Sequence, residues 1–360
     1  MILAGDVGGT KTRLALFEAD RAGRLRARDE RTYPSREFQG LGPIVARYQR
    51  EVPAPIEGAA FGVAGPVKDG VSVTTNLPWV VEAKSLAALL HLPAAGLLND
   101  LEATAWGLGE LQDEDTLTLQ AGAPAPGRDR RRDGDRGDAG TVRAGNSAII
   151  AAGTGLGEAG LFWNGRRHIP FATEGGHADF APRSTIEDEL LIHLRARFGR
   201  VSWERVVSGP GLVEVHDFLA GRPAGARDQP SGEGAPTAAG PAHGEAVEAN
   251  LGEDRAATIS HAALAGTSEV AIRALDLFVS VYGAEAGNLA LKTLSTAGIY
   301  IGGGIAPRIV EKLKTGTFLE AFLDKGRMRP LLEAMPVRVV LNDRTALLGA
   351  ARQAIEAEAA

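Results

Sequence analysis

The stretch GDVGGTKT (residues 5–12) lies between two short segments, at residues 2–4 and 13–17, whose pattern is typical of β-strands. A phosphate-binding P-loop would need glycine where Thr10 stands, and it would begin a helix. The stretch therefore predicts a tight β-hairpin turn. Its glycines would let the backbone approach a phosphate closely, with the Thr10 hydroxyl as a further donor. The alternative is an ordinary tight turn with a surface aspartate.

Two further glycine clusters follow. The first, AGTGLG at residues 152–157, lies between expected strands at residues 147–152 and 159–163 and so repeats the first arrangement. It departs from the dinucleotide-binding fingerprint, because Glu158 occupies the third glycine position and a strand follows. The second, GGG at residues 302–304, ends an expected strand and precedes Pro307, which is typical of a helix start. Each cluster alone is consistent with an ordinary turn, but the three together favour a nucleotide site.

The chain as a whole alternates short apolar runs with helical patterns, which is typical of an α/β fold. Its 360 residues are enough for about two domains. Residues 122–145 and 220–249 have too little apolar content to pack and are predicted to be flexible surface insertions. The long apolar helix expected at residues 270–294 is a candidate surface for a homodimer.

Composition excludes several classes of function. The net charge of −6 disfavours a nucleic-acid partner. The absence of cysteine excludes disulfides, thiolate nucleophiles and cysteine-ligated metals. The first residues lack the pattern of a signal peptide and no apolar run is long enough to span a bilayer, so we expect a cytoplasmic protein without a membrane partner.

Asn99 and Asp100 follow an expected strand at residues 96–98 and begin a helix. A carboxylate at the carboxyl end of a strand lies where open α/β sheets bind ligands. Such a carboxylate can accept the proton of a hydroxyl group during phosphoryl transfer. The alternative is that the pair only caps the helix, since Asn99 and Glu102 have the spacing of a capping box.

The stretch EGGH at residues 174–177 places a carboxylate and an imidazole on a glycine-bent loop. These groups are suited to hydrogen bonds with adjacent hydroxyls of a sugar. His177 and Asp179 are alternatively half of a metal site, although no further ligands stand nearby in the sequence. At the mouth of the first turn, the Asp6 carboxylate is a candidate for holding hydrated Mg²⁺.

Six motifs occur in the order and approximate spacing of the bacterial glucokinase family: GDVGGT, LLNDLEATAWG, GTGLG, EGGHADFAP, SGPGL and GGGIAPR. The chain resembles that family over its length, apart from the two insertions. This resemblance implies membership of the hexokinase, Hsp70 and actin superfamily, with two actin-like (ribonuclease H-like) domains and a central cleft. The implied small domain comprises residues 1–109 and 345–360, and the large domain comprises residues 110–344. The related ROK family fits less well, because it typically carries a cysteine-rich zinc motif and its repressors begin with DNA-binding helices.

The resemblance implies ATP-dependent phosphorylation of D-glucose to glucose 6-phosphate, the first step of glycolysis, with Mg²⁺ as cofactor and Asp100 as general base. The implied sugar contacts are Asn99, Asp100, Glu174, His177 and Glu204. The implied nucleotide contacts are Gly5, Asp6, Val7, Gly8, Gly9, Thr10, Gly153, Thr154, Gly155, Gly302, Gly303 and Gly304. For Glu204 the alternative is a surface acid paired with an arginine. Alternative functions are a kinase for another hexose or an amino sugar, or a catalytically weak, sugar-sensing ATPase.

Overall fold

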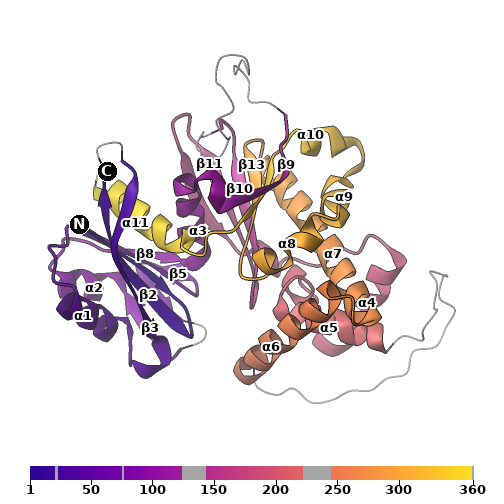
Figure 1. Ribbon diagram of the computed structural model, residues 1–360, viewed down its shortest axis with the longest axis horizontal. Coiled ribbons are helices and arrows are strands. Elements are labelled where there is room, and N and C mark those ends of the chain that lie inside the picture. Colours follow the sequence, from indigo (N-terminus) through magenta and orange to yellow (C-terminus); the bar gives the residue numbers. More distant parts are fainter. Residues whose placement is uncertain (21–22, 75–76, 124–142, 222–244, 359–360) are drawn as a thin grey trace.

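The structure is a computed structural model that describes residues 1–20, 23–74, 77–123, 143–221 and 245–358, with only the backbone described for residues 245–254. Two mixed β-sheets lie in separate lobes (Figure 1). The first sheet has the order β3-β2-β1-β4-β8 and contains β1 (Ile2–Val7), β2 (Lys11–Ala19), β3 (Leu25–Pro34), β4 (Gly58–Val63) and β8 (Gly96–Asn99). The second has the order β12-β11-β10-β13-β14-β9 and contains β9 (Thr116–Gln120), β10 (Ser147–Ala152), β11 (Leu156–Trp163), β12 (His168–Thr173), β13 (Gly298–Gly302) and β14 (Val337–Val340). A small sheet joins β5 (Val67–Lys68), β6 (Val71–Val73) and β7 (Val80–Glu82).

Helices surround the sheets. In the described residues they are α1 (Leu41–Glu51), α2 (Ala83–Leu90), α3 (Asp100–Gly107), α4 (Thr185–Phe198), α5 (Gly209–Ala220), α6 (Glu245–Leu264), α7 (Glu269–Thr293), α8 (Val310–Leu313), α9 (Thr317–Leu323), α10 (Arg329–Glu333) and α11 (Thr345–Glu358). Short 3₁₀ turns include η1 (Ser35–Glu37), η2 (Leu108–Glu110), η3 (Asp113–Asp115), η5 (Gly175–His177), η6 (Trp203–Arg205), η7 (Ala306–Ile309) and η8 (Gly326–Met328). None of the helices described is long and apolar enough to cross a membrane.

The two glycine turns occupy equivalent places in the two sheets. β1 pairs antiparallel with β2 and parallel with β4, while β10 pairs antiparallel with β11 and parallel with β13. Each turn therefore joins the central strand of its sheet to an antiparallel neighbour. The α/β fold and the repeated strand–turn–strand unit that the sequence predicted are confirmed.

Helix α7 forms the centre of the second lobe. Its buried residues pack with α5, α6 and α9 and against β10, and its exposed side chains, such as those of Glu269, Asp276 and Lys292, are charged. The sequence pattern made this helix a candidate dimer surface, and that prediction is wrong because its apolar residues form the core of the lobe.

Helices α3 and α11 pack unusually closely where the two lobes meet (Figure 1). A Cβ at Gly107 would overlap the backbone of Thr345, and a Cβ at Gly349 would overlap the Ala103 carbonyl. Apolar side chains of α11, such as Leu347, also pack against β1 and β4. The C-terminal helix thereby fixes the position of α3 relative to the first sheet.

Several local expectations need correction. Residues 245–249 were assigned to the second insertion but belong to α6, and residues 222–244 and 124–142 lie outside the described residues. The helix expected from Pro307 is a 3₁₀ turn followed by the short helix α8. Trp79 belongs to the core of the first lobe, since it is 2% exposed and its indole N–H donates to the Phe38 carbonyl at 3.2 Å.

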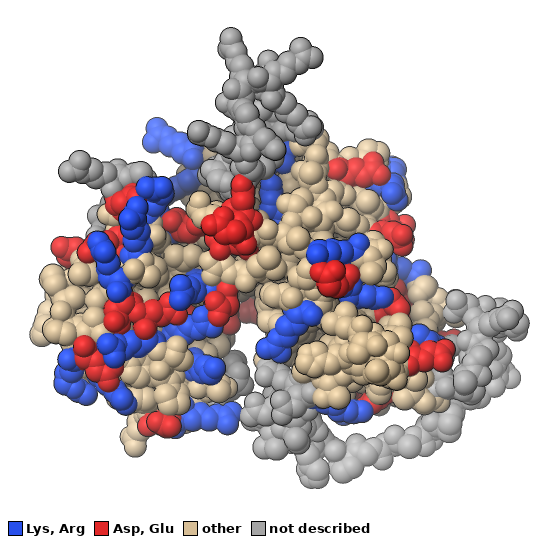
Figure 2. All heavy atoms as spheres, viewed as in Figure 1, with Lys and Arg blue, Asp and Glu red and all other residues tan. Residues whose placement is uncertain are grey.

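Charged side chains of both signs are interspersed over the visible face of the molecule (Figure 2). On the first sheet, for example, Arg28 of β3 pairs with Glu18 of β2 at 2.5 Å, and Arg31 pairs with Asp29 at 3.2 Å. Exposed pairs of this kind contribute little to stability.

Candidate active site

Asp100 is the first residue of α3, at the carboxyl end of β8. The residue before it caps the helix, because Asn99 Oδ1 accepts hydrogen bonds from the N–H groups of Leu101 at 2.9 Å and Glu102 at 3.4 Å. The Asn99 amide also donates to the Gly65 carbonyl at 3.1 Å. Asn99 therefore caps the helix, and the helix does not depend on the Asp100 carboxylate for its cap.

Asp100 keeps an exposed surface although protein surrounds it on most sides. The loss of hydration raises its pKa above that of an ordinary aspartate, and the charge of Glu174 adds to this increase. Hydrogen bonds from the Leu101 N–H and from its own backbone oppose the effect. A carboxylate that is reachable, partly desolvated and next to another acid is suited to take up a proton.

Asp6 lies near Asp100 at the end of β1. Burial raises its pKa to about 6, opposed by Arg13, while Asp100 and Asp343 raise it further. The Arg13 guanidinium donates to Asp343 Oδ2 at 2.8 Å, and its charge also stabilises the ionised form of Asp6. The result is a site in which a cation would relieve the repulsion between carboxylates.

Glu174, His177 and Glu204 come together from two different turns. His177 Nε2 lies 3.8 Å from Glu174 Oε2, and His177 Nδ1 lies 3.9 Å from Glu204 Oε1. Glu174 and His177 are exposed, whereas Glu204 is 30% exposed. The predicted sugar contacts therefore form one cluster of donors and acceptors, and the charge interaction between Glu174 and Asp100 connects it to the end of α3.

Glu204 also connects this cluster to the second glycine turn. Its Oε2 accepts a hydrogen bond from the Leu156 N–H at 2.9 Å, and a Cβ at Gly155 would lie 2.5 Å from the same oxygen. The carboxylate points to the turn, and no ion pair joins it to an arginine of the described chain, so the alternative of a surface pair with arginine is wrong. Asp179 is likewise engaged elsewhere, since it accepts from Arg200 Nε at 2.8 Å.

In the first turn, the Gly8 N–H donates to the Lys11 carbonyl at 2.9 Å and closes the hairpin. Gly9 and Thr10 are at least partly exposed at its tip. Ser35, which no sequence motif singled out, braces the turn: its hydroxyl donates to the Gly8 carbonyl at 2.8 Å and its N–H to the Thr10 carbonyl at 3.0 Å.

Gly5 and Val7 were also predicted as nucleotide contacts, and in the structure the packing of the first lobe accounts for both residue types. Val7 is 1% exposed in the core, and a Cβ at Gly5 would overlap the ring of Phe61.

In the second lobe, three of the predicted glycine-cluster residues line a pocket of about 250 Å³: Gly153, Thr154 and Gly304. Sequence reasoning missed the rest of its lining, which comes from α5, α6 and the turn after β13: Gly209, Leu212, Ala256, Ala257, Ser260, His261, Ile305, Arg308 and Ile309. The pocket combines apolar walls with a few polar groups, as small-ligand sites do.

Gly155, Gly302 and Gly303 do not line this pocket. Gly303 has a φ of +83°, and a Cβ there would overlap the Ala152 backbone, so glycine is required for the close approach of the two loops. The Tyr282 hydroxyl fixes the strand ends behind them, because it donates to the Ile150 carbonyl and accepts from the Ala152 N–H, both at 3.2 Å.

A buried pair of acids, Glu158 and Glu285, lies beneath the loop that carries Glu174. A Cβ at Gly175 would overlap the Glu158 carboxylate, and both acids are almost fully buried. Glu285 accepts hydrogen bonds from Lys292 at 3.0 Å and Asn288 at 2.8 Å. Burial, followed by the charge of Glu285, raises the pKa of Glu158 to about 8. Glu158 therefore holds a proton at neutral pH.

This protonated acid predicts a dependence of stability on pH. The unfolded chain releases the Glu158 proton near pH 4.5, whereas the folded chain keeps it to about pH 8, so the free energy of unfolding falls as pH rises through this window. We expect Glu158→Gln to remove this dependence on pH and to stabilise the protein by up to about 4 kcal/mol at pH 8, and by less than about 1 kcal/mol at pH 5. Urea unfolding at both pH values measures this, with the exposed Glu114→Gln as control. Equal effects of Glu158→Gln at pH 5 and pH 8 would contradict the assignment.

Two related α/β lobes, a glycine turn in each, and an acidic cluster at the start of the helix between them define a sugar kinase of the actin-like fold. A family model described as Glucokinase matches residues 3–357. A glucokinase of Nostoc sp. is 40% identical over 358 residues, which are 98% of this chain and 98% of that protein. The chain belongs to the glucokinase family, and the glucose phosphorylation predicted from the sequence is confirmed.

Solved structures agree with this assignment. The crystal structure of a glucokinase from an Antarctic psychrotroph has a TM-score of 0.79 and 30% identity, and the match covers 99% of this chain and 98% of that chain. A ROK family glucokinase from Streptomyces griseus, in complex with glucose and AMPPNP, has a TM-score of 0.56 and 22% identity over 99% of both chains. At that identity the second likeness shows the fold alone.

Proposed function

We propose that the phosphoryl donor is ATP and that Asp100 is the general base. The observation that supports Asp100 most directly is its place at the start of α3, where it is partly desolvated and interacts with the charge of Glu174, while Asn99 caps the helix. The primary hydroxyl oxygen of glucose attacks the γ-phosphorus, the bond from that phosphorus to the β-bridging oxygen breaks, and the hydroxyl proton passes to the Asp100 carboxylate. ADP and glucose 6-phosphate are the products.

The remaining predicted residues have complementary roles in this proposal. Glu174, His177 and Glu204 hold the sugar hydroxyls, with His177 placed between the two carboxylates. The N–H groups of Gly9 and Thr10 in the first turn, and of Thr154 and Gly155 in the second, donate to the phosphates. The pocket between α5, α6 and Gly304 receives the adenosine, as supported by its apolar lining and by AMPPNP in the structurally similar Streptomyces griseus enzyme.

Mg²⁺ would arrive with ATP, and Asp6 is the residue that would hold it, through water. The residues fit this ion, because Asp6 is a partly buried carboxylate whose pKa is raised to about 6 and which interacts with the charge of a second acid, Asp100. When bound, the ion neutralises charge on the phosphate oxygens.

We further propose the domain boundaries expected from the sequence, with residues 1–109 and 345–360 in the small domain and residues 110–344 in the large one. The packing of α11 on β1 and β4 supports them. Closure of the two domains would exclude water, which competes with glucose as phosphoryl acceptor. A cytoplasmic enzyme of glycolysis is part of the proposal. The homodimer also remains a proposal, and its surface would lie outside α7, which is buried.

A donor-by-sugar activity matrix on the purified protein tests the donor and the sugar together. ATP, ADP and polyphosphate are each combined with glucose, mannose, fructose and N-acetylmannosamine, and sugar phosphate formation is measured directly. We expect the ATP and glucose combination to give the highest kcat/KM, and activity with ATP to require Mg²⁺. Higher kcat/KM with ADP or polyphosphate would contradict the proposed donor, and ATP hydrolysis that ignores added sugar would support the sugar-sensing ATPase.

A further inference from the structure

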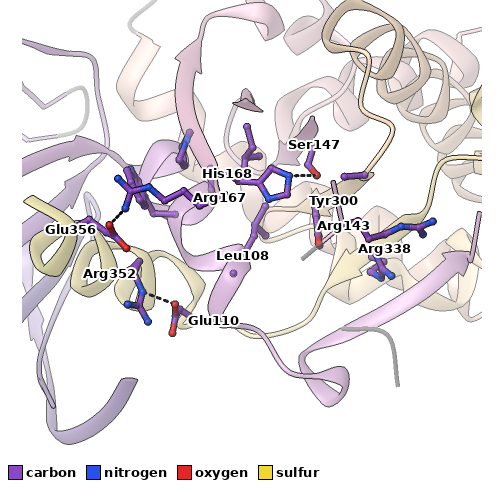
Figure 3. A pocket seen from close by; sticks show the side chains of 16 residues that line it. Leu108, Glu110, Arg143, Ser147, Arg167, His168, Tyr300, Arg338, Arg352 and Glu356 are labelled. Carbon is purple, nitrogen blue, oxygen red and sulfur yellow. Dashed lines mark hydrogen bonds and ion pairs between the residues drawn. The ribbon is translucent and has the colours of Figure 1, made fainter. Parts of the chain in front are cut away.

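A second pocket, of about 170 Å³, lies where the two lobes meet, at the opposite end of α3 from Asp100. One wall is formed by the end of α3, by η2 and by Arg352 and Glu356 of α11. The other wall is formed by the second sheet, including Ser147, His168 and Tyr300 (Figure 3). This pocket shares no lining residue with the pocket assigned to adenosine or with the acidic cluster around Asp100.

Positive charge dominates the lining. Four arginines line the pocket, and two of them are neutralised within it: Arg352 Nε lies 2.7 Å from Glu110 Oε1, and Arg167 forms an ion pair with Glu356. Figure 3 shows these two pairs at one end of the pocket. At the other end Arg143 and Arg338 lie together beside Tyr300. Arg143 donates to the carbonyls of Ala121 and Ala123.

Arg338 is the decisive residue. It lies in β14, opposite Tyr300 of β13 and Thr118 of β9, and is only 6% exposed. No hydrogen bond or ion pair joins its side chain to any other residue in the part of the chain that the structure describes. A guanidinium cannot lose its proton at physiological pH, so it cannot escape the cost of burial by becoming neutral. A mostly buried cation that has no partner among the described residues and reaches a pocket is suited to holding a bound anion.

We propose that this pocket binds a small organic phosphate monoester. The Arg338 fork is suited to two phosphate oxygens at once. The apolar side chains of Leu108 and Leu161 and the ring of Tyr300 are available to the organic part. Because the walls belong to both lobes, the bound molecule contacts both and restrains their relative rotation.

Calorimetric titration of the full-length protein with phenyl phosphate tests the proposal. Saturating AMPPNP is present, so that the phosphate turns of the active site are occupied. We expect one phenyl phosphate per chain, weaker binding of inorganic phosphate and no binding of phenol. Arg338→Gln should weaken the binding of phenyl phosphate at least 10-fold, whereas Arg329→Gln, at an exposed arginine of α10, should leave it unchanged.

Thermal unfolding distinguishes a ligand-binding arginine from a structural one. Without ligand, Arg338→Gln should raise Tm, because it removes a buried charge without a partner, and phenyl phosphate should no longer shift the Tm of this variant. If this variant does not fold, the same titration is done with Arg338→Lys, which keeps the charge but loses the planar fork that would hold two phosphate oxygens. Unchanged affinity in the variant, or no binding of phenyl phosphate to the wild type, would overturn the proposal. Inorganic phosphate binding as tightly as phenyl phosphate would overturn the part that concerns an organic ester.

Discussion

Asp100→Asn is expected to lower kcat for glucose phosphorylation by about 10²–10⁴-fold, the range that a general base contributes. Asparagine keeps the size of the side chain and the oxygen that accepts from the Leu101 N–H at 2.9 Å, so α3 should begin as before. It cannot take up the hydroxyl proton. Steady-state kinetics with ATP and glucose measure kcat, and calorimetry should show that the variant still binds glucose.

Glu102→Gln is the matched control for this variant. Glu102 lies in the same first turn of α3 and its pKa is also raised by burial, but it has no part in the proposed mechanism. It therefore reports the loss of one acid from the helix N-terminus without loss of the base. In the wild type, kcat/KM should fall as pH falls through the raised pKa of Asp100, because the protonated acid is not a base. A kcat for Asp100→Asn within tenfold of the wild-type value would exclude this residue as the base.

The features that sequence reasoning located correctly are local ones. The strand Ser147–Ala152 was predicted with the bounds that the structure gives, because a short apolar run followed by glycines is a signal carried within a few residues. The exposed edge strand β3 was missed, since its residues are mostly charged and polar and its strand character comes from pairing with β2.

The residues of the candidate site also fall into two groups, those that sequence motifs identify and those that only the folded structure brings to the site. Glu174 and His177 lie in a sequence motif and could be predicted, because the motif resembles that of the sugar-contacting residues in the glucokinase family. Ser35 could not, since its contact with the first turn depends on how η1 lies in space. The adenosine pocket is a similar case, because half of its lining comes from α5 and α6, which come together only through their packing in the folded lobe.

Glycines show most clearly why sequence alone was insufficient. In the sequence, Gly349 is one small residue in the C-terminal helix, and replacing such a glycine by alanine is normally stabilising by up to about 1 kcal/mol, because alanine favours the helix. The structure predicts the opposite. A Cβ on Gly349 would overlap the Ala103 carbonyl and lie 2.5 Å from the Gly107 backbone nitrogen. These are backbone atoms of α3, which cannot rotate away as the end of a side chain could.

We therefore expect Gly349→Ala to lower the free energy of unfolding by about 3 kcal/mol, at the upper end of the usual cost of overpacking. Because α11 holds α3 against the first sheet, the variant should also lower kcat by displacing Asp100, whereas a purely global loss of stability would leave the folded fraction fully active. Urea unfolding and active-site-normalised kinetics measure the two effects separately. Gly109→Ala is the control, since a Cβ at Gly109 meets no atom within 4 Å. Wild-type stability of Gly349→Ala would show that α3 and α11 can separate without cost, and would remove the basis for assigning the C-terminal helix a role in positioning Asp100.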